Sequence, residues 1–160
     1  MENKKMIEKA LLYQDRFAEH PDVCAALSEL YAGNRPLSAR AYAMKARRLG
    51  ADVPLPLKCA AENADLDPSG AYLLGQELCH LDRHDEAYPY LAAAGKSPDM
   101  SVAPSAALFL ADLLSYQRPG DREVIREWYH RAASLGNPDI LPVLSKTSNA
   151  KNNYQSVASF

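Results

Sequence analysis

The sequence predicts an all-α protein built from short helices joined by tight turns. Alanine and leucine recur at helical spacing, whereas β-branched residues are sparse and no stretch alternates for long between apolar and polar residues. The 11 prolines and 7 glycines fall between the apolar segments more than inside them. We expect eight or nine helices in a single domain spanning residues 1–147, followed by a flexible tail at residues 148–160.

Turn signals separate the expected helices at short, fairly regular intervals. They are "EHPD" at 19–22, "AGNRP" at 32–36, "GADVPLP" at 50–56, "LDPSG" at 66–70, "DRHD" at 82–85, "GKSPD" at 95–99, "QRPGD" at 117–121 and "GNPD" at 136–139. Four aspartates stand where an N-cap or a first helical turn favours them: Asp22, Asp67, Asp85 and Asp121. Three glycines follow alanine-rich segments, where a residue with positive φ often ends a helix: Gly50, Gly95 and Gly136. If Asp85 caps its helix, Pro89 falls at the end of the first turn, where a missing N–H is tolerated.

An internal repeat supports this organisation. The segment "RAYAMKARRLG" at 40–50 aligns without a gap with "REWYHRAASLG" at 126–136. The matched pairs are Tyr42 with Trp128, Ala46 with Ala132, Leu49 with Leu135 and Gly50 with Gly136. Between them, "EAYPYLAAAG" at 86–95 carries Tyr88 and Ala92 in related places. The unit is a helix, a turn and a second helix ending in small residues, and we expect Trp128 in the seam between units.

The segment "SGAYLLGQELCHLDRHDEAYPYLAAAGKSPD" resembles a tetratricopeptide repeat. The large, small, large positions of the first helix fall on Leu74, Gly75 and Leu78, and the small, large, small positions of the second helix fall on Ala87, Leu91 and Ala94. The segment ending "WYHRAASLGNPD" is more similar to a Sel1-like repeat. The resemblance covers about residues 22–139. It departs from the family where Ala71 replaces the usual tryptophan and where "VPLPLKCAAENAD" separates the first two units.

The resemblance implies a right-handed α-solenoid of about three helix-turn-helix repeats preceded by an extra N-terminal helix. In such proteins the first helices line a groove that binds a peptide segment of a partner protein. Carried onto this chain, the groove positions are Glu29, Tyr72, Gln76, His80, Asp112 and Tyr116. The implied function is a non-enzymatic, bacterial adaptor or chaperone, similar in size, repeat number and mild acidity to type III secretion chaperones of the translocator class.

Two alternative functions remain open at this point. One is a self-associating structural or assembly protein, in which the N-terminal helix pairs two copies into a homodimer instead of capping the repeats; its apolar residues are Met6, Ile7, Leu11, Leu12 and Phe17. An enzyme or a metal-binding protein is the other alternative. His80 and His84 have i, i+4 spacing, but a helix end is expected between them and no third ligand lies near in sequence. Cys79 and His80 are adjacent, so their side chains diverge by about 100° on a helix. We therefore predict no catalytic residue, metal or cofactor.

Charge and composition narrow the choice of partners. The net charge of −2 gives no global basic field that attracts nucleic acid. A basic helix at residues 40–48 is interpreted as a solvated face, with Arg40, Lys45, Arg47 and Arg48, flanked by Arg35 and Lys58. The longest apolar stretches are far shorter than the roughly 18 residues of a membrane span, and charges interrupt the first apolar segment where a signal peptide needs none. Three scattered cysteines, interpreted as buried reduced thiols, indicate a cytoplasmic protein: Cys24, Cys59 and Cys79.

Overall fold

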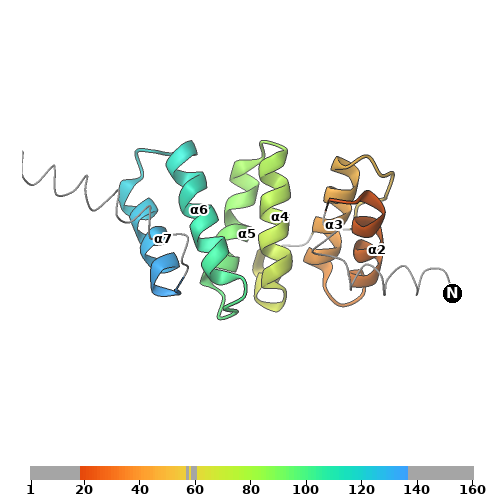
Figure 1. Ribbon diagram of the computed structural model, residues 1–160, viewed down its shortest axis with the longest axis horizontal. Helices are drawn as coiled ribbons and strands as arrows, with labels where there is room; N and C mark the ends of the chain where they lie inside the picture. The colour runs from red at the N-terminus through yellow and green to blue at the C-terminus, as the bar shows by residue number, and fades with distance from the viewer. Residues whose placement is uncertain (1–18, 57, 59–60, 137–160) are drawn as a thin grey trace, which may run out of the picture.

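The structure, a computed structural model, describes residues 19–56, 58 and 61–136 and is entirely helical over that part of the chain (Figure 1). It contains there six α-helices, one 3₁₀ helix and no strand. The elements are α2 (Pro21–Tyr31), α3 (Pro36–Arg48), η1 (Ala61–Leu66), α4 (Pro68–His80), α5 (His84–Lys96), α6 (Ala103–Gln117) and α7 (Arg122–Ser134). The all-α prediction is confirmed. The helices expected nearer the two ends, including the N-terminal one, and the boundary at residue 147 lie outside the described residues.

The helices stand in a row and follow the order of the chain. Each α-helix makes its principal contacts with its neighbours in sequence, from α2 against α3 to α6 against α7. A turn of only three residues, 81–83, joins α4 to α5, so these two helices pack as an antiparallel pair, in agreement with the predicted unit of a helix, a turn and a second helix. The connection from α3 to α4 is much longer, and η1 in that connection packs against both α4 and α5.

The second helix of each pair has the same length and the same register. Helices α3, α5 and α7 each contain 13 residues. Counted from their first residues, the seventh position is aromatic in all three and the eleventh is a fully buried alanine: Tyr42 and Ala46, Tyr90 and Ala94, Trp128 and Ala132. The predicted match between α3 and α7 therefore holds in register. For α5 the prediction of Tyr88 and Ala92 is wrong by two residues, because the buried face of α5 is the one that carries Tyr90 and Ala94.

Two of the three predicted glycine endings are confirmed. Gly50 after α3 and Gly136 after α7 have φ values of 102° and 82°, which a side chain rarely tolerates. Gly95 is different, because it lies inside α5 and is buried. A Cβ atom on Gly95 would meet Cζ3 of Trp128 at 2.8 Å, so this glycine makes room for a ring rather than ending a helix.

The predicted helix starts are confirmed with one shift. Asp67 and Asp121 are the N-cap residues of α4 and α7, and Asp22 lies in the first turn of α2. Asp85 is in the first turn of α5 but Arg83 is the N-cap, so Pro89 is the sixth residue of the helix and lies inside it. There its ring removes one backbone hydrogen bond from the ladder of α5.

Contacts between alternate helices place the row in two layers. The ring of Tyr72 on α4 meets that of Phe109 on α6 edge to face, with centroids 5.9 Å apart. Trp128 of α7 packs on Gly95 of α5, and Arg131 Nε donates a hydrogen bond to the Gly95 carbonyl. Thus α4 and α6 lie side by side in one layer, and α5 and α7 meet in the other.

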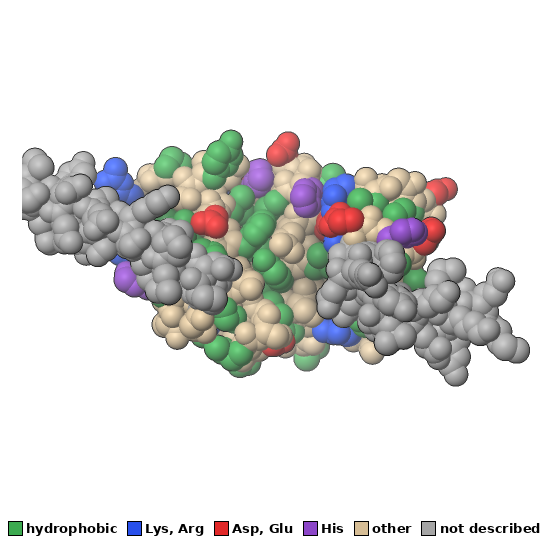
Figure 2. All heavy atoms as spheres, in the orientation of Figure 1, with side chains coloured by type: hydrophobic (Ala, Val, Ile, Leu, Met, Phe, Trp, Pro, Cys, Tyr) green, Lys and Arg blue, Asp and Glu red, His purple; other side chains and the backbone are tan. Residues whose placement is uncertain are grey.

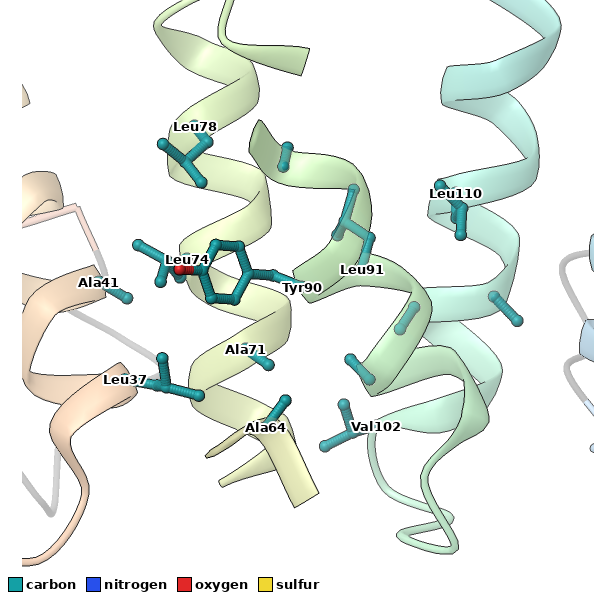
Figure 3. Close-up of a cluster of buried hydrophobic side chains, with 14 of the residues drawn as sticks. Leu37, Ala41, Ala64, Ala71, Leu74, Leu78, Tyr90, Leu91, Val102 and Leu110 are labelled. Atoms are coloured by element: carbon teal, nitrogen blue, oxygen red, sulfur yellow. The ribbon is translucent and has the colours of Figure 1, made fainter. Parts of the chain in front are cut away.

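The core is a seam of large side chains set against very small ones. Gly75 on α4 lies against Leu91 on α5 so closely that a Cβ atom would be 2.6 Å from that leucine's side chain. Leu74 and Leu91 are almost entirely buried, and Figure 3 shows Tyr90 reaching from α5 across Leu74 toward Ala41 of α3. Trp128 is only 7% exposed. The predicted packing role of the aromatic and alanine cluster is therefore confirmed.

We predict that Gly95→Ala lowers the free energy of unfolding by about 1–3 kcal/mol, because the new methyl group displaces the Trp128 ring from its packed position. The measurement is urea unfolding followed by circular dichroism. Gly33→Ala is the matched control, because no described atom lies within 4 Å of its Cβ position, and it should change stability by less than about 1 kcal/mol. Equal stability of the two variants would show that the close approach at Gly95 is not needed.

Candidate functional site

Three of the four basic residues of α3 have partners within the protein, because Lys45 and Arg48 form ion pairs and Arg40 bonds to a backbone carbonyl, so the interpretation of this helix as a solvated face is wrong for most of them. Lys45 is buried and its ammonium group is 3.3 Å from a Glu19 carboxylate oxygen. Arg40 donates a hydrogen bond to the Pro56 carbonyl. Arg47 remains exposed. Because a buried cation needs a partner, these contacts hold α3 against its neighbours. The local sequence does not show which groups form the pairs.

A buried carboxylate at the N-cap of α4 is hydrogen-bonded to the first turn of α3. Asp67 is 2% exposed, and its oxygens accept hydrogen bonds from the Ser38 backbone N–H at 2.9 Å and from the Ser38 hydroxyl at 2.6 Å. Asp67 also caps its own helix through the Gly70 N–H at 3.1 Å and pairs with Arg35 at 3.2 Å. A Cβ atom on Gly70 would lie 2.3 Å from the Asp67 carboxylate, so only glycine fits there.

A second buried carboxylate holds the other end of the same interface. The Glu77 side chain is 4% exposed and accepts two hydrogen bonds from the Arg48 guanidinium, at 2.8 and 3.0 Å. The hydrogen bond to Glu77 raises the pKa of Arg48 above its ordinary value. The parallel donors of arginine match the two oxygens of a carboxylate, which fixes the orientation of α3 on α4.

The predicted groove residues lie on the first helices of the three pairs. Tyr72, Gln76 and His80 are spaced four residues apart on α4, and Asp112 and Tyr116 have the same spacing on α6. Because residues four apart share a helix face, and because Tyr72 meets Phe109, the two sets run along adjacent helices. Glu29 is exposed on α2, at the far end of the row from α6 (Figure 1).

Exposure differs strongly along this face. Tyr116 is 84% exposed and His80 and Asp112 are exposed, whereas Tyr72 and Gln76 are half-buried. Tyr72 packs partly against the core, and burial raises its pKa. Figure 2 shows hydrophobic atoms gathered along the middle of the displayed face, with acidic groups and histidines around them. Such a surface offers apolar area together with carboxylate, amide and imidazole groups for hydrogen bonds.

Asp112 already has a partner from α7. The Tyr129 hydroxyl donates a hydrogen bond to Asp112 at 2.7 Å. Burial and this hydrogen bond raise the pKa of Tyr129 to about 12. The gapless alignment of residues 126–136 with 40–50 pairs Tyr129 with Ala43, so the repeat gave no signal for this contact.

The histidine and cysteine candidates occupy the positions that helix ends and packing impose. His80 ends α4 and His84 begins α5, so the predicted helix end between them is confirmed. Residues 19–56, 58 and 61–136 contain no group of three or more His, Cys, Asp or Glu side chains arranged to hold a metal ion. Cys24 is fully buried and Cys79 half-buried, and burial raises the pKa of both thiols. Cys59 lies outside the described residues.

No family model, curated protein or solved structure matches this chain. The described helices include none long and apolar enough to cross a bilayer.

We predict that Arg48→Met lowers the free energy of unfolding by about 3 kcal/mol, because it leaves the buried Glu77 carboxylate without its cation. Replacing both residues, as Arg48→Met with Glu77→Met, should recover most of the loss. Urea unfolding of the two variants and of the exposed control Arg47→Met tests this. A double variant as unstable as Arg48→Met alone would contradict the explanation.

We predict that Tyr129 makes stability fall at alkaline pH. Its pKa rises from 10.0 to about 12 on folding, so the folded protein holds the phenolic proton more tightly than the unfolded chain. The resulting stabilisation is complete below pH 10 and is lost as the pH rises toward about 12. Tyr129→Phe should flatten the dependence of the urea midpoint on pH in this range, and Asp112→Asn should lower the pKa of Tyr129. An unchanged alkaline slope in Tyr129→Phe would refute the assignment.

Proposed function

We propose that the protein is a non-enzymatic adaptor or chaperone that binds a peptide segment of a partner protein along α4 and α6. The observation that carries this proposal is the pair of adjacent helix faces bearing Tyr72, Gln76 and His80 beside Asp112 and Tyr116, joined by the contact of Tyr72 with Phe109. Aromatic and amide groups of this kind supply apolar area and hydrogen bonds with little loss of side-chain freedom.

We also propose that the three helix pairs are tetratricopeptide or Sel1-like repeats forming a right-handed solenoid. The shared register of α3, α5 and α7 supports this, and so do the matching glycine endings at Gly50 and Gly136. The tight contact of Gly75 with Leu91 is the small-against-large packing expected of such a repeat. The buried thiol of Cys24 fits the proposed cytoplasmic location, where thiols stay reduced.

The peptide would lie across two helices of one layer. Spacing places Gln76 one turn beyond Tyr72 on α4, and Asp112 about one turn beyond Phe109 on α6. His80 and Tyr116 follow one turn later on each helix. An extended segment crossing this face would therefore meet paired polar and aromatic groups at successive turns, with Tyr116 as its most exposed aromatic contact.

The test begins with selection of binding peptides from a random library displayed against the full chain. The dissociation constant of a selected, labelled peptide is then measured by fluorescence anisotropy. We expect Tyr116→Ala or Gln76→Ala to weaken binding about 5-fold or more, because each removes a contact group from the bound face. Leu66→Ala is the matched control, since Leu66 is 86% exposed on η1 and lies off this face.

Unchanged affinity in both Tyr116→Ala and Gln76→Ala would remove the proposed binding face. Equal weakening by Leu66→Ala would indicate that any loss of exposed apolar area, rather than this particular face, decides the affinity.

A further inference from the structure

A pocket of about 470 Å³ opens between α3, α4 and α5, and none of the predicted groove residues lines it. Its floor is apolar and is formed by Leu74 and Leu78 of α4 and by Tyr90 of α5. These three side chains belong to the buried core, so the floor is held rigidly (Figure 3). The volume lies within the range of about 300–1,000 Å³ that is usual for small-molecule sites.

The pocket arises where the row departs from its own repeat. Between α5 and α7, Trp128 fills the space against Gly95, the twelfth residue of α5. At the same positions between α3 and α5, the aromatic residue is the smaller Tyr90 and the twelfth residue of α3 is Arg47. The long connection that contains η1 also passes this point, and Lys58 and Ala61 from it line the pocket. The space therefore has walls from both the helices and the connection.

The rim of the pocket carries more positive than negative charge. Arg40, Lys58 and Arg83 line it together with a single carboxylate, that of Glu86. Arg83 forms two hydrogen bonds with Glu86, one of them at 2.8 Å, whereas the Lys58 ammonium is 3.8 Å away and its side chain is 70% exposed. The pKa of the Glu86 carboxyl is lowered, first by its hydrogen bond with Arg83 and also by the charges of Lys58 and Arg40. Three cations thus surround one anion, which leaves an excess of two positive charges.

We infer that this pocket binds an organic carboxylate carried on an apolar body. The apolar part lies on Leu74, Leu78 and Tyr90, and the carboxylate lies at the rim beside Lys58 and Arg40. Arg83 stays with Glu86, so Lys58 is the cation with the most freedom to turn toward a ligand. An apolar floor selects an amphipathic anion over inorganic phosphate, because burying the floor adds hydrophobic free energy that a small hydrated anion does not provide. The same chemistry is offered by a free aliphatic acid and by the carboxyl terminus of a polypeptide that ends in an apolar residue.

The test titrates the full chain with octanoate and with N-acetyl-L-phenylalanine, and follows backbone amide shifts by NMR. The first probe represents a free acid and the second a polypeptide terminus. Octan-1-ol, N-acetyl-L-phenylalanine methyl ester and inorganic phosphate are the comparison ligands. We expect at least one carboxylate to shift amides of α3, α4 and α5 and to bind more tightly than its neutral analogue and than phosphate. The probe that binds more tightly identifies the source.

Two charge variants are expected to change the affinity in opposite directions. An effect on binding can therefore be told apart from misfolding, which would not tighten binding in either variant. Lys58→Gln should weaken carboxylate binding roughly 2- to 5-fold, and Glu86→Gln should tighten it by a similar factor because it removes the competing carboxylate. Lys96→Gln is the control. Lys96 lies on α5, as Glu86 does, but it is next to the Trp128 ring and does not line the pocket. Equal binding of the neutral analogues, equal binding of phosphate, or no response to Glu86→Gln would overturn the inference. Because these residues are separate from Tyr116 and Gln76, failure here leaves the proposed peptide-binding face untouched.

Discussion

The α3–α4 interface is the constraint on which the rest of this structure depends. Since each helix packs mainly on its neighbours in sequence, this interface connects the α2–α3 pair with the remaining helices. Two buried carboxylates, Asp67 and Glu77, lie at opposite ends of α4 and bind opposite ends of α3. Buried ion pairs add little net stability, because desolvation offsets their attraction. Their hydrogen-bond geometry does fix one angle and one register between the two helices, which an apolar interface leaves freer.

The residues that could be predicted from the sequence are those whose signal is local or repeated. The helix starts at Asp67 and Asp121, the endings at Gly50 and Gly136 and the shared register of α3 and α7 all follow from short motifs. Gly95 shows the limit, because its role is set by Trp128 from a helix that lies two further along the chain. The partners of Lys45, Arg48 and Tyr129 are also remote in sequence, so no local pattern could reveal them. The groove residues could be placed on their helices from the repeat, but the exposure of each depends on packing between helices.

The two proposed sites use different layers of the same row. The peptide-binding face belongs to α4 and α6, which are first helices of their pairs. The pocket lies between the second helices α3 and α5, and its floor comes from α4 and α5. Helix α4 contributes to both, through Gln76 and His80 on one face and Leu74 and Leu78 on the other. Helix α4 therefore links the two proposed sites, and Asp67 and Glu77 fix its position against α3.

The common ending of α3 and α7 has a consequence for how such a chain can grow. Each helix ends with a leucine C-cap, Leu49 or Leu135, followed by a glycine with positive φ. The chain therefore leaves both helices in the same direction relative to the helix axis. A duplicated helical hairpin inserted after either glycine meets the same exit geometry. Because most contacts join helices adjacent in sequence and some join alternate helices, an extra unit would have to match the helix pairs on either side of it. A hairpin gained by duplication after Gly136 would leave the α3–α4 interface intact, whereas one inserted after Gly50 would separate Asp67 and Glu77 from their partners on α3.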